Sequence, residues 1–450
     1  MKCSLRSAFL SLLVVGMFDH VPAARAIPSI FKTGVTIDKP KKTFDSFVMF
    51  SGPDGLTHLI DMTGREVHQW AYPGLPGAMM NPSVTNGAKG HTLLQTEALS
   101  GKDGSGITGN RTISEVDWNG RKVWQWSGAP GSDGARQNHD WMRLASGNTL
   151  VLVAATHPVA LLNGATVNDQ AIEEVTPNGR VIWRWVAGDH LDEFGLSAAG
   201  LAYLKEETSS NSQPDAWGYL EINDMQPLGP NRWFDGGDQR FRPDNIMIDS
   251  RKGNFVVIID RETGHVVWRL GPDFPGTPHD ADHRLMQLRL PRPVDQISGQ
   301  HNAHLIPKGF PGEGDLLLFD DQGPAGFPRV ALGVYGGSRV LEINPVTRQI
   351  VWDYTAVRSG LPAWTFFSSF VSSAQRLSNG NTLIDEGMNG RIFQVTPGGE
   401  IVWEYVSPYR GTQSFGAVPV TSMLVYRAQA VPVEWLPVPL AARPQPSFVK

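Results

Sequence analysis

Two histidines stand three residues apart in the segment Gln300-His301-Asn302-Ala303-His304. A Pro- and Gly-rich run precedes them, and a short apolar segment, 314–319, follows and ends in the turn 320–323. Imidazole titrates close to neutral pH, so it can act as a nucleophile, as a general acid and base, or as a metal ligand. We therefore interpret this segment as a polar site on a rigid frame of strands.

Polar side chains recur just before turns of the Gly-Asn type. Four segments share this placement: 137–141, 242–249, 300–304 and 367–377. Equivalent positions of a repeated unit lie at a similar depth around one axis, so these side chains are expected to converge on a central channel. The candidate catalytic residues are His139, His301 and His304, and the candidate substrate-binding residues are Asp140, Asn245, Asn302, Gln375 and Arg376.

Three histidines without a partner cysteine leave two kinds of chemistry open. Imidazoles bind zinc, copper and iron, usually with a carboxylate, which Asp140 offers. Alternatively, the site transfers an anionic group, because the planar guanidinium of arginine binds sulfate or phosphate oxygens. Arg329, shortly after the turn 320–323, is better placed for this role than Arg339. A third interpretation is that these polar side chains only satisfy one another and the backbone.

Other motifs carry less weight. His279 and His283 have metal-like spacing, but their Pro-rich surroundings favour a solvated loop, and His157 and His190 follow strand-like runs and are expected at the rim. The sequence has no G-x-S-x-G, no P-loop and no G-x-G-x-x-G after a strand. Hydrolase triads and nucleotide-binding sites therefore have no support.

A sixfold repeat predicts the frame. A turn followed by alternating apolar residues recurs with these aligned positions: His68, Trp124, Trp183, Trp268, Trp352 and Trp403. Gly-Asn-type turns fall between the copies, so the chain predicts an all-β, six-bladed β-propeller in which the recurring tryptophans pack between blades. The two longest spacings predict inserted loops at about 186–232 and 271–300, with the best helix candidate at 196–207.

Composition agrees with many short strands. The chain has 450 residues, with 48 Gly, 33 Pro and 14 Trp, and only 18% of its residues are charged. The net charge is −5 and no basic block stands out, which argues against nucleic acid as a partner. No later stretch is long and apolar enough to predict a membrane span.

The N-terminus predicts export. Lys2 and Arg6 precede the apolar run 9–18, and Ala24-Arg25-Ala26 fits a cleavage site. We expect a signal peptide at 1–26, a single propeller domain at 27–430 and a Pro-rich, extended C-terminal tail at 431–450. The mature protein would be periplasmic or secreted. It would have no thiol, because the one cysteine, Cys3, lies in the signal peptide.

Over roughly 45–428 the chain resembles the bacterial arylsulfotransferase (aryl-sulfate sulfotransferase) family. The matching residues are Asn138-His139-Asp140-Trp141 with Gly147-Asn148-Thr149-Leu150, Asp260-Arg261-Glu262-Thr263-Gly264 with Trp268-Arg269-Leu270-Gly271, Gln300-His301 with Phe319-Asp320, and Ala374-Gln375-Arg376-Leu377 with Gly380-Asn381-Thr382-Leu383-Ile384. The resemblance implies a periplasmic six-bladed propeller. It also implies PAPS-independent transfer of a sulfuryl group from a phenolic sulfate ester to a phenol through a histidine intermediate. The implied partners are a small aryl sulfate and a phenol, with no metal and no cofactor.

The family's site residues carry over only in part. His139 looks like the histidine of the His-Asp motif, His301 like that of the Gln-His motif, and Arg329 like the arginine that follows the turn after Phe319. The resemblance places the nucleophilic histidine before the last Gly-Asn turn, where 368–375 contains no histidine. Either His301 or His304 takes that role, or the chemistry differs, or the chain binds an anion without transferring it.

Two other functions stay open at this point. The main alternative is a non-catalytic periplasmic propeller that binds a small anionic or aromatic ligand, or a partner protein. A metal-dependent hydrolase or lyase is the third hypothesis, and loss of activity to a chelator would favour it.

Overall fold

The structure is a computed structural model that describes residues 32–98, 110–209, 217–271, 297–327, 336–415 and 418–437. All its elements belong to one compact unit, Thr33–Lys450. The predicted signal peptide, Arg329 and the pair His279 and His283 lie outside the described residues.

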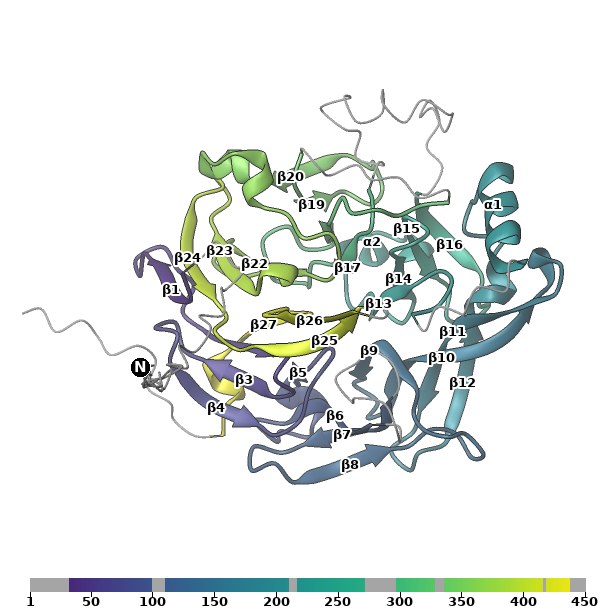
Figure 1. Ribbon diagram of the computed structural model, residues 1–450, viewed down its shortest axis with the longest axis horizontal. Coiled ribbons are helices and arrows are strands. Elements are labelled where there is room, and N and C mark those ends of the chain that lie inside the picture. Colours follow the sequence, from purple (N-terminus) through teal and green to yellow (C-terminus); the bar gives the residue numbers. More distant parts are fainter. Residues whose placement is uncertain are drawn as a thin grey trace, which may run out of the picture. The chain divides into compact units, whose positions relative to one another are not determined.

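Six antiparallel sheets form a six-bladed β-propeller, which confirms the predicted fold (Figure 1). From the innermost strand outward, blade 1 is β27 (Ala428–Val431), β2 (Phe47–Ser51), β3 (Thr57–Ile60) and β4 (Glu66–Trp70); blade 2 is β5 (Ala78–Met79), β6 (Thr92–Ala98), β7 (Asn110–Val116) and β8 (Lys122–Trp126); and blade 3 is β9 (Gln137–Arg143), β10 (Thr149–Val159), β11 (Ala165–Val175) and β12 (Val181–Val186).

The other three blades have the same order. Blade 4 is β13 (Ile222–Pro227), β14 (Ile246–Ser250), β15 (Phe255–Ile259) and β16 (Val266–Leu270); blade 5 is β17 (His301–Leu305), β18 (Leu316–Asp320), β19 (Arg339–Ile343) and β20 (Ile350–Tyr354); and blade 6 is β21 (Ser373–Arg376), β22 (Thr382–Glu386), β23 (Arg391–Val395) and β24 (Ile401–Val406), with β1 (Gly34–Asp38) at its outer edge. Innermost strands of neighbouring blades contact one another from β9 through β13, β17, β21 and β27 to β5.

Burial follows the position of a strand within its blade. Every residue of β15 and of β18 is buried, because neighbouring blades cover both faces of the middle strands. The outer strands β4 and β8 begin exposed and end in a buried tryptophan, Trp70 and Trp126. The core therefore lies between the blades and is divided into several apolar clusters.

The recurring tryptophans join the blades, as the sequence predicts. In each blade an indole N–H of the outer strand donates to a carbonyl oxygen in the last turn of the next blade. The bonds are Trp70 to Asp117 (3.2 Å), Trp126 to Gly179 (3.3 Å), Trp185 to Gly264 (2.9 Å), Trp268 to Pro345 (2.8 Å), Trp352 to Pro397 (2.8 Å) and Trp403 to Met62 (2.8 Å). The last of these runs from blade 6 to blade 1, so the set links all six blades.

Both ends of the described chain take part in ring closure. β27 supplies the innermost strand of blade 1, where Ala430 pairs with Val48 of β2. β1 adds to the outer edge of blade 6, where Gly34 pairs with Val406 of β24. Blade 1 therefore combines N-terminal and C-terminal strands, and its innermost strand ends at Val431.

The remaining elements connect or extend the blades. The predicted helix at 196–207 is found as α1 (Ala198–Ser209), and the expected insertion 186–232 also contains β13. The short elements are α2 (Arg232–Asp235), η1 (Pro82–Val84), η2 (Ala160–Leu162), η3 (Ala187–His190), η4 (Gln239–Phe241), η5 (Ala356–Ser359), η6 (Ala363–Thr365), η7 (Gly387–Asn389), η8 (Val433–Trp435) and the hairpin β25 (Gly411–Phe415)–β26 (Val418–Ser422). Neither helix in the described ranges has the length and apolar character needed to cross a membrane.

Replacing one of these inter-blade tryptophans is expected to weaken the whole ring. Trp268→Ala removes a side chain that is only 4% exposed and its bond to Pro345, and should lower the free energy of unfolding by about 3–5 kcal/mol. Trp364→Ala is the control, because Trp364 is 68% exposed. Urea denaturation measures both variants, and equal losses would contradict the inter-blade role.

Candidate functional site

The innermost strands bring His139 of β9 and His301 of β17 into one buried cluster. Both imidazoles lie beside the ring of Tyr426, with centroid separations of 6.2 and 6.5 Å, and they are 1% and 3% exposed. Together with Asp140, Asp224 and Arg427 they form what we call the central cluster. Two of the three predicted catalytic histidines therefore meet, although 162 residues separate them along the chain (301 − 139).

The backbone is strained where these side chains enter the cluster. His139 has φ = 70°, Asn302 has φ = 56° and Val371, just before β21, has φ = 59°. The ladders of β9 with β10 and of β17 with β18 are interrupted at the same places, as in a β-bulge that re-aims a side chain. Such conformations cost non-glycine residues about 1–3 kcal/mol each and concentrate at functional sites.

His301 uses both of its ring nitrogens. Nδ1 donates to the Gly299 carbonyl at 2.9 Å and to Asp321 Oδ2 at 2.8 Å, and Nε2 accepts from the Val371 N–H at 3.1 Å. An acceptor role for Nε2 requires a neutral ring with its proton on Nδ1. Burial, and then the charge of Arg251, move the pKa of His301 well below its ordinary value, in agreement with this tautomer.

His139 keeps one ring nitrogen free. Nδ1 bonds to Asn138 Oδ1, and within the described ranges nothing hydrogen-bonds Nε2. Burial lowers the pKa of His139 to about 3, with further contributions from the charges of Lys252, Arg251 and Arg427. At neutral pH His139 is therefore an uncharged imidazole with an available lone pair on Nε2, the form that a nucleophile or a base requires.

The third predicted histidine is less buried than the other two. His304, also on β17, is half-buried, and its Nδ1 donates to the Asn302 carbonyl at 2.9 Å. Burial lowers the pKa of His304 to about 4, and Arg427 and Arg376 contribute to the shift. His304 is therefore neutral as well, but it has a more open position than His139.

An arginine that precedes β27 joins three blades in the cluster. Arg427 Nη1 donates to both carboxylate oxygens of Asp140 at 3.3 Å, and Nη2 donates to Asp224 Oδ1 at 2.6 Å. Asp140 also accepts from the backbone N–H of Met225 in the next blade at 3.1 Å. Burial raises the pKa of Asp140 to about 7, while Arg427 acts in the opposite direction.

Sequence reasoning missed Arg427 and Asp224 because no Gly-Asn turn marks their strands. The same signal misplaced the segment 242–249, which leads into β14, the second strand of blade 4. Its Gly253-Asn254 turn joins β14 to β15 instead of following an innermost strand. The expectation that 242–249 occupies the same place as the other three segments is therefore wrong.

Further buried carboxyl groups surround the cluster. Burial moves the pKa values of Asp249 and Asp321 well above their usual range, which favours their neutral forms. Arg251 and Lys252 share one carboxylate, Glu221, whose Oε2 lies 3.0 and 3.7 Å from their nitrogens. Because burial favours the neutral forms of Asp249 and Asp321 while basic side chains lie close by, the region suits a small anion.

Four of the predicted binding residues make hydrogen bonds within the fold, and Asn302 Nδ2 also donates to Asp224 Oδ1 of the central cluster at 3.4 Å. Asn245 Nδ2 donates to the Arg240 carbonyl and its Oδ1 accepts from the Arg261 N–H, both at 3.0 Å, so the structure does not bring Asn245 into the cluster. The other three connect blades. Asn302 Oδ1 accepts from Ala374 N–H at 3.2 Å, Gln375 Oε1 accepts from Ala430 N–H at 2.8 Å, and Arg376 Nη2 donates to Glu342 Oε2 at 2.6 Å.

An apolar group adjoins the histidines. Leu75, Val371, Leu424 and Tyr426 pack together with Phe370 alongside them. Tyr426 belongs to this group and also contacts both histidine rings, and its hydroxyl donates to the Asn223 carbonyl at 2.9 Å. The site thus combines charged donors with an apolar, partly aromatic wall.

Sequence comparison places this propeller in a family. A family model described as Arylsulfotransferase (ASST) matches residues 132–407, more than half of the chain and the span of blades 3 to 6. The chain therefore belongs to the arylsulfotransferase family. No curated protein matches it by sequence.

Comparison with solved structures finds distant likenesses. A protein of unknown function from Bacteroides caccae is 12% identical, over 86% of this chain and 98% of its own, with a TM-score of 0.43. Quinohemoprotein alcohol dehydrogenase from Comamonas testosteroni is 12% identical, over 87% and 71%, with a TM-score of 0.39. A streptogramin B lyase is 12% identical, over 89% and 92%, with a TM-score of 0.38. Likeness at this level carries no argument about the chemistry of this chain.

Removing the central arginine should destabilise the fold. Arg427→Met leaves Asp140 and Asp224 buried without their cation, and should cost about 3–5 kcal/mol of unfolding free energy. Arg65→Met is the control, because the Arg65 side chain is 67% exposed and its ion pair with Asp61 should contribute about 0–1 kcal/mol. Urea denaturation at neutral pH compares them, and similar costs would disprove a structural role for the buried network.

The low pKa of His139 predicts a pH dependence of stability. Between its folded pKa of about 3 and its ordinary value of 6.5, the unfolded chain binds a proton at His139 that the folded chain does not, so this residue makes stability fall as the pH falls. His139→Asn should reduce the slope of unfolding free energy against pH by about 1.4 kcal/mol per pH unit between pH 4 and 6. Urea titrations across this range measure both slopes, and identical slopes would show that His139 is not held neutral.

Proposed function

We propose that this chain transfers a sulfuryl group from a phenolic sulfate ester to a phenol acceptor, without PAPS. Membership of the arylsulfotransferase family supports the reaction class. The observation that carries the proposal is a set of buried donors around His139 for which the described residues offer no acceptor. Asn138 Nδ2, Arg251 Nε and Arg427 Nε have no acceptor in the described part of the chain.

Unsatisfied buried donors are costly, at about 1–3 kcal/mol each or more when charged, and a bound anion would offset that cost. A sulfuryl group presents three acceptor oxygens, which guanidinium and amide N–H groups match well. Buried oxygens of Asp224 and Asp249 also lack donors, so the cluster is not built for anions alone. Burial raises the pKa of Asp249 well above its usual range, which favours a protonated form whose O–H is a donor.

His139 is our proposed nucleophile. Its Nε2 lone pair would attack sulfur and form an N–S bond while the S–O bond to the aryl group breaks. The aryl oxygen leaves with the electron pair and takes up a proton. The acceptor phenol then attacks the same sulfur, the N–S bond breaks back to His139, and the acceptor gives up a proton. Over the cycle the two protons cancel, so no cofactor or metal is required.

The other groups take supporting roles in this proposal. Arg427 and Arg251 would stabilise negative charge on the sulfuryl oxygens in the transition state. The apolar group around Tyr426 would receive the aryl ring. His301 is less suited to attack sulfur, because the Val371 N–H already uses its Nε2 lone pair. Its role would be to hold Val371, part of the apolar group, beside His139.

A second function, ligand binding without transfer, is favoured by a different observation. Asn302, Gln375 and Arg376 are committed to bonds between blades, and His301 has both nitrogens occupied. A cluster with so many structural bonds could bind a small anionic or aromatic ligand and leave it unchanged.

We further propose that the chain acts in the periplasm or is secreted, on the evidence of its predicted signal peptide, and that its partners are small aryl compounds.

The decisive experiment supplies the purified mature chain with a chromogenic aryl sulfate and excess phenol, with and without a chelator. We expect release of the chromogenic phenol and formation of phenyl sulfate that survive chelation. His139→Ala should lower kcat/KM by at least about 100-fold. The rim variant His157→Ala is the matched control and should retain activity.

Mass spectrometry of the enzyme quenched without acceptor tests the nucleophile, because a sulfuryl adduct should map to the peptide that contains His139. If the native chain shows no turnover although its thermal midpoint and those of the variants are the same, sulfuryl transfer from this substrate class is rejected. Saturable binding of the aryl sulfate under those conditions would then favour the ligand-binding function.

A further inference from the structure

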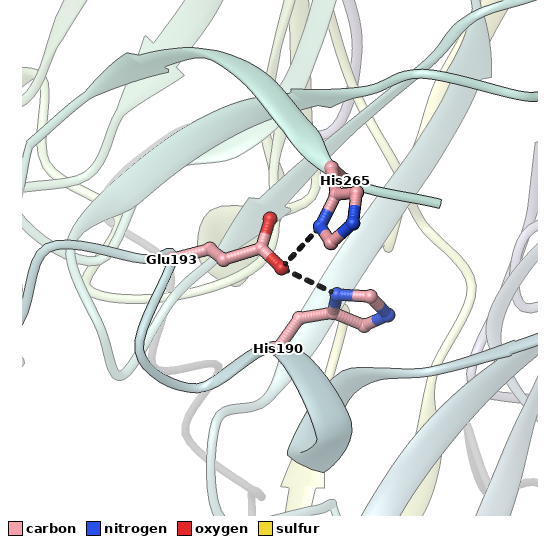
Figure 2. Close-up of side chains that lie close together, drawn as sticks. All are labelled: His190, Glu193 and His265. Carbon is pink, nitrogen blue, oxygen red and sulfur yellow. Dashed lines mark hydrogen bonds and ion pairs between the residues drawn. The ribbon is translucent and has the colours of Figure 1, made fainter. Parts of the chain in front are cut away.

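Three metal-ligand side chains meet at the boundary between blades 3 and 4, apart from the central cluster. His190 ends η3, Glu193 lies three residues later, and His265 immediately precedes β16. Figure 2 shows both imidazoles turned toward the same carboxylate. Glu193 Oε1 lies 2.8 Å from His190 Nδ1 and 2.9 Å from His265 Nδ1, and the ligand atoms of all three lie within 4.8 Å of one another.

Neighbouring groups fix two of these side chains in place. The second carboxylate oxygen of Glu193 accepts from the Val266 N–H at 2.6 Å, so Oε1 stays directed at the two rings. The His190 ring stacks on Trp185 with a centroid separation of 5.0 Å and an interplanar angle of 14°. Trp185 in turn bonds the Gly264 carbonyl at 2.9 Å. Such outer contacts orient metal ligands and are typical of real metal sites.

The charge at this place also favours a cation. The carboxylates of Glu193, Asp192 and Asp260 all act electrostatically on His265. Two imidazole nitrogens and one carboxylate oxygen form a set that zinc commonly takes, with a water as fourth ligand. Bonds of about 2.0–2.2 Å would connect these atoms after small rotations of the side chains, for which the 69% exposed His265 has room.

We propose that His190, Glu193 and His265 bind one divalent transition metal of the zinc class. The ion would connect the segment after blade 3 to the start of β16 in blade 4, at a place where the Trp185 bond already joins the two blades. The ion would act at this blade boundary, where its three ligands lie.

Zinc titration of the chelator-treated mature chain, followed by calorimetry, tests this site. We expect one tight site per chain, with affinity at least tenfold lower in His265→Ala and in Glu193→Gln. Both variants should fold, since His265 is exposed and glutamine preserves the shape of Glu193. His157→Ala is the matched control, because His157 is another histidine paired with a carboxylate, Asp189, at 2.9 Å. It should bind zinc like the native chain, as should a chain in which His279 and His283 are both alanine.

Two further measurements separate a metal site from a surface ion-pair network. Cobalt(II) bound in place of zinc should give the strong visible absorption of a four-coordinate site in the native chain and not in His265→Ala. Zinc should raise the thermal midpoint of the native chain and of His157→Ala, and should raise that of His265→Ala much less, because zinc binds only the folded state. No zinc binding, or equal affinity in His265→Ala and His157→Ala, would overturn the proposal. Its fate is independent of sulfuryl transfer, since that reaction is expected to survive chelation.

Discussion

The ion pairs of Arg427 with Asp140 and Asp224 are the constraint on which the centre of this protein depends. The three residues come from blades 1, 3 and 4, and 287 and 203 residues separate the arginine from its two partners. Burying the guanidinium or either carboxylate without its partner would cost several kcal/mol. The three segments must therefore be correctly placed relative to one another before any of these charges is stable. The positions of His139 and Tyr426 follow, because they are sequence neighbours of Asp140 and Arg427.

Polar residues at the centre serve stability and chemistry at once. Asp140, Asn302 and Gln375 each accept a backbone N–H from the innermost strand of the next blade, which replaces a hydrogen bond that neighbouring blades cannot otherwise make. The groups left for chemistry are those without a partner in the described part of the chain, namely His139 Nε2, Asn138 Nδ2, Arg251 Nε and Arg427 Nε. Unused bonding capacity therefore identifies the candidate site better than polarity does.

The fold could be predicted because its signal is repeated: an aromatic residue at a fixed offset marks every outer strand, and the same tryptophans bond the next blade. His139 and His301 could be predicted because each lies on a strand that precedes a marked turn. Arg427 and Asp224 could not, since Arg427 immediately precedes a strand taken from the far end of the chain and the strand of Asp224 is followed by an irregular connection. The Nε2 of His139 has no partner among the described residues, whereas the Nε2 of His301 accepts from the Val371 N–H. This difference depends on backbone bulges at these positions, which residue spacing does not predict.

Blade 1 takes its innermost strand from residues 428–431, so the order of synthesis matters. A chain made from the N-terminus can complete blades 2 to 5 while blade 1 still lacks β27 and the centre still lacks Arg427. The candidate site is then the last part of the protein to form, and a chain cut short after blade 6 would have most of its sheets but an open ring and unpaired central aspartates. C-terminal proteolysis would thus abolish the site while most of the fold remained.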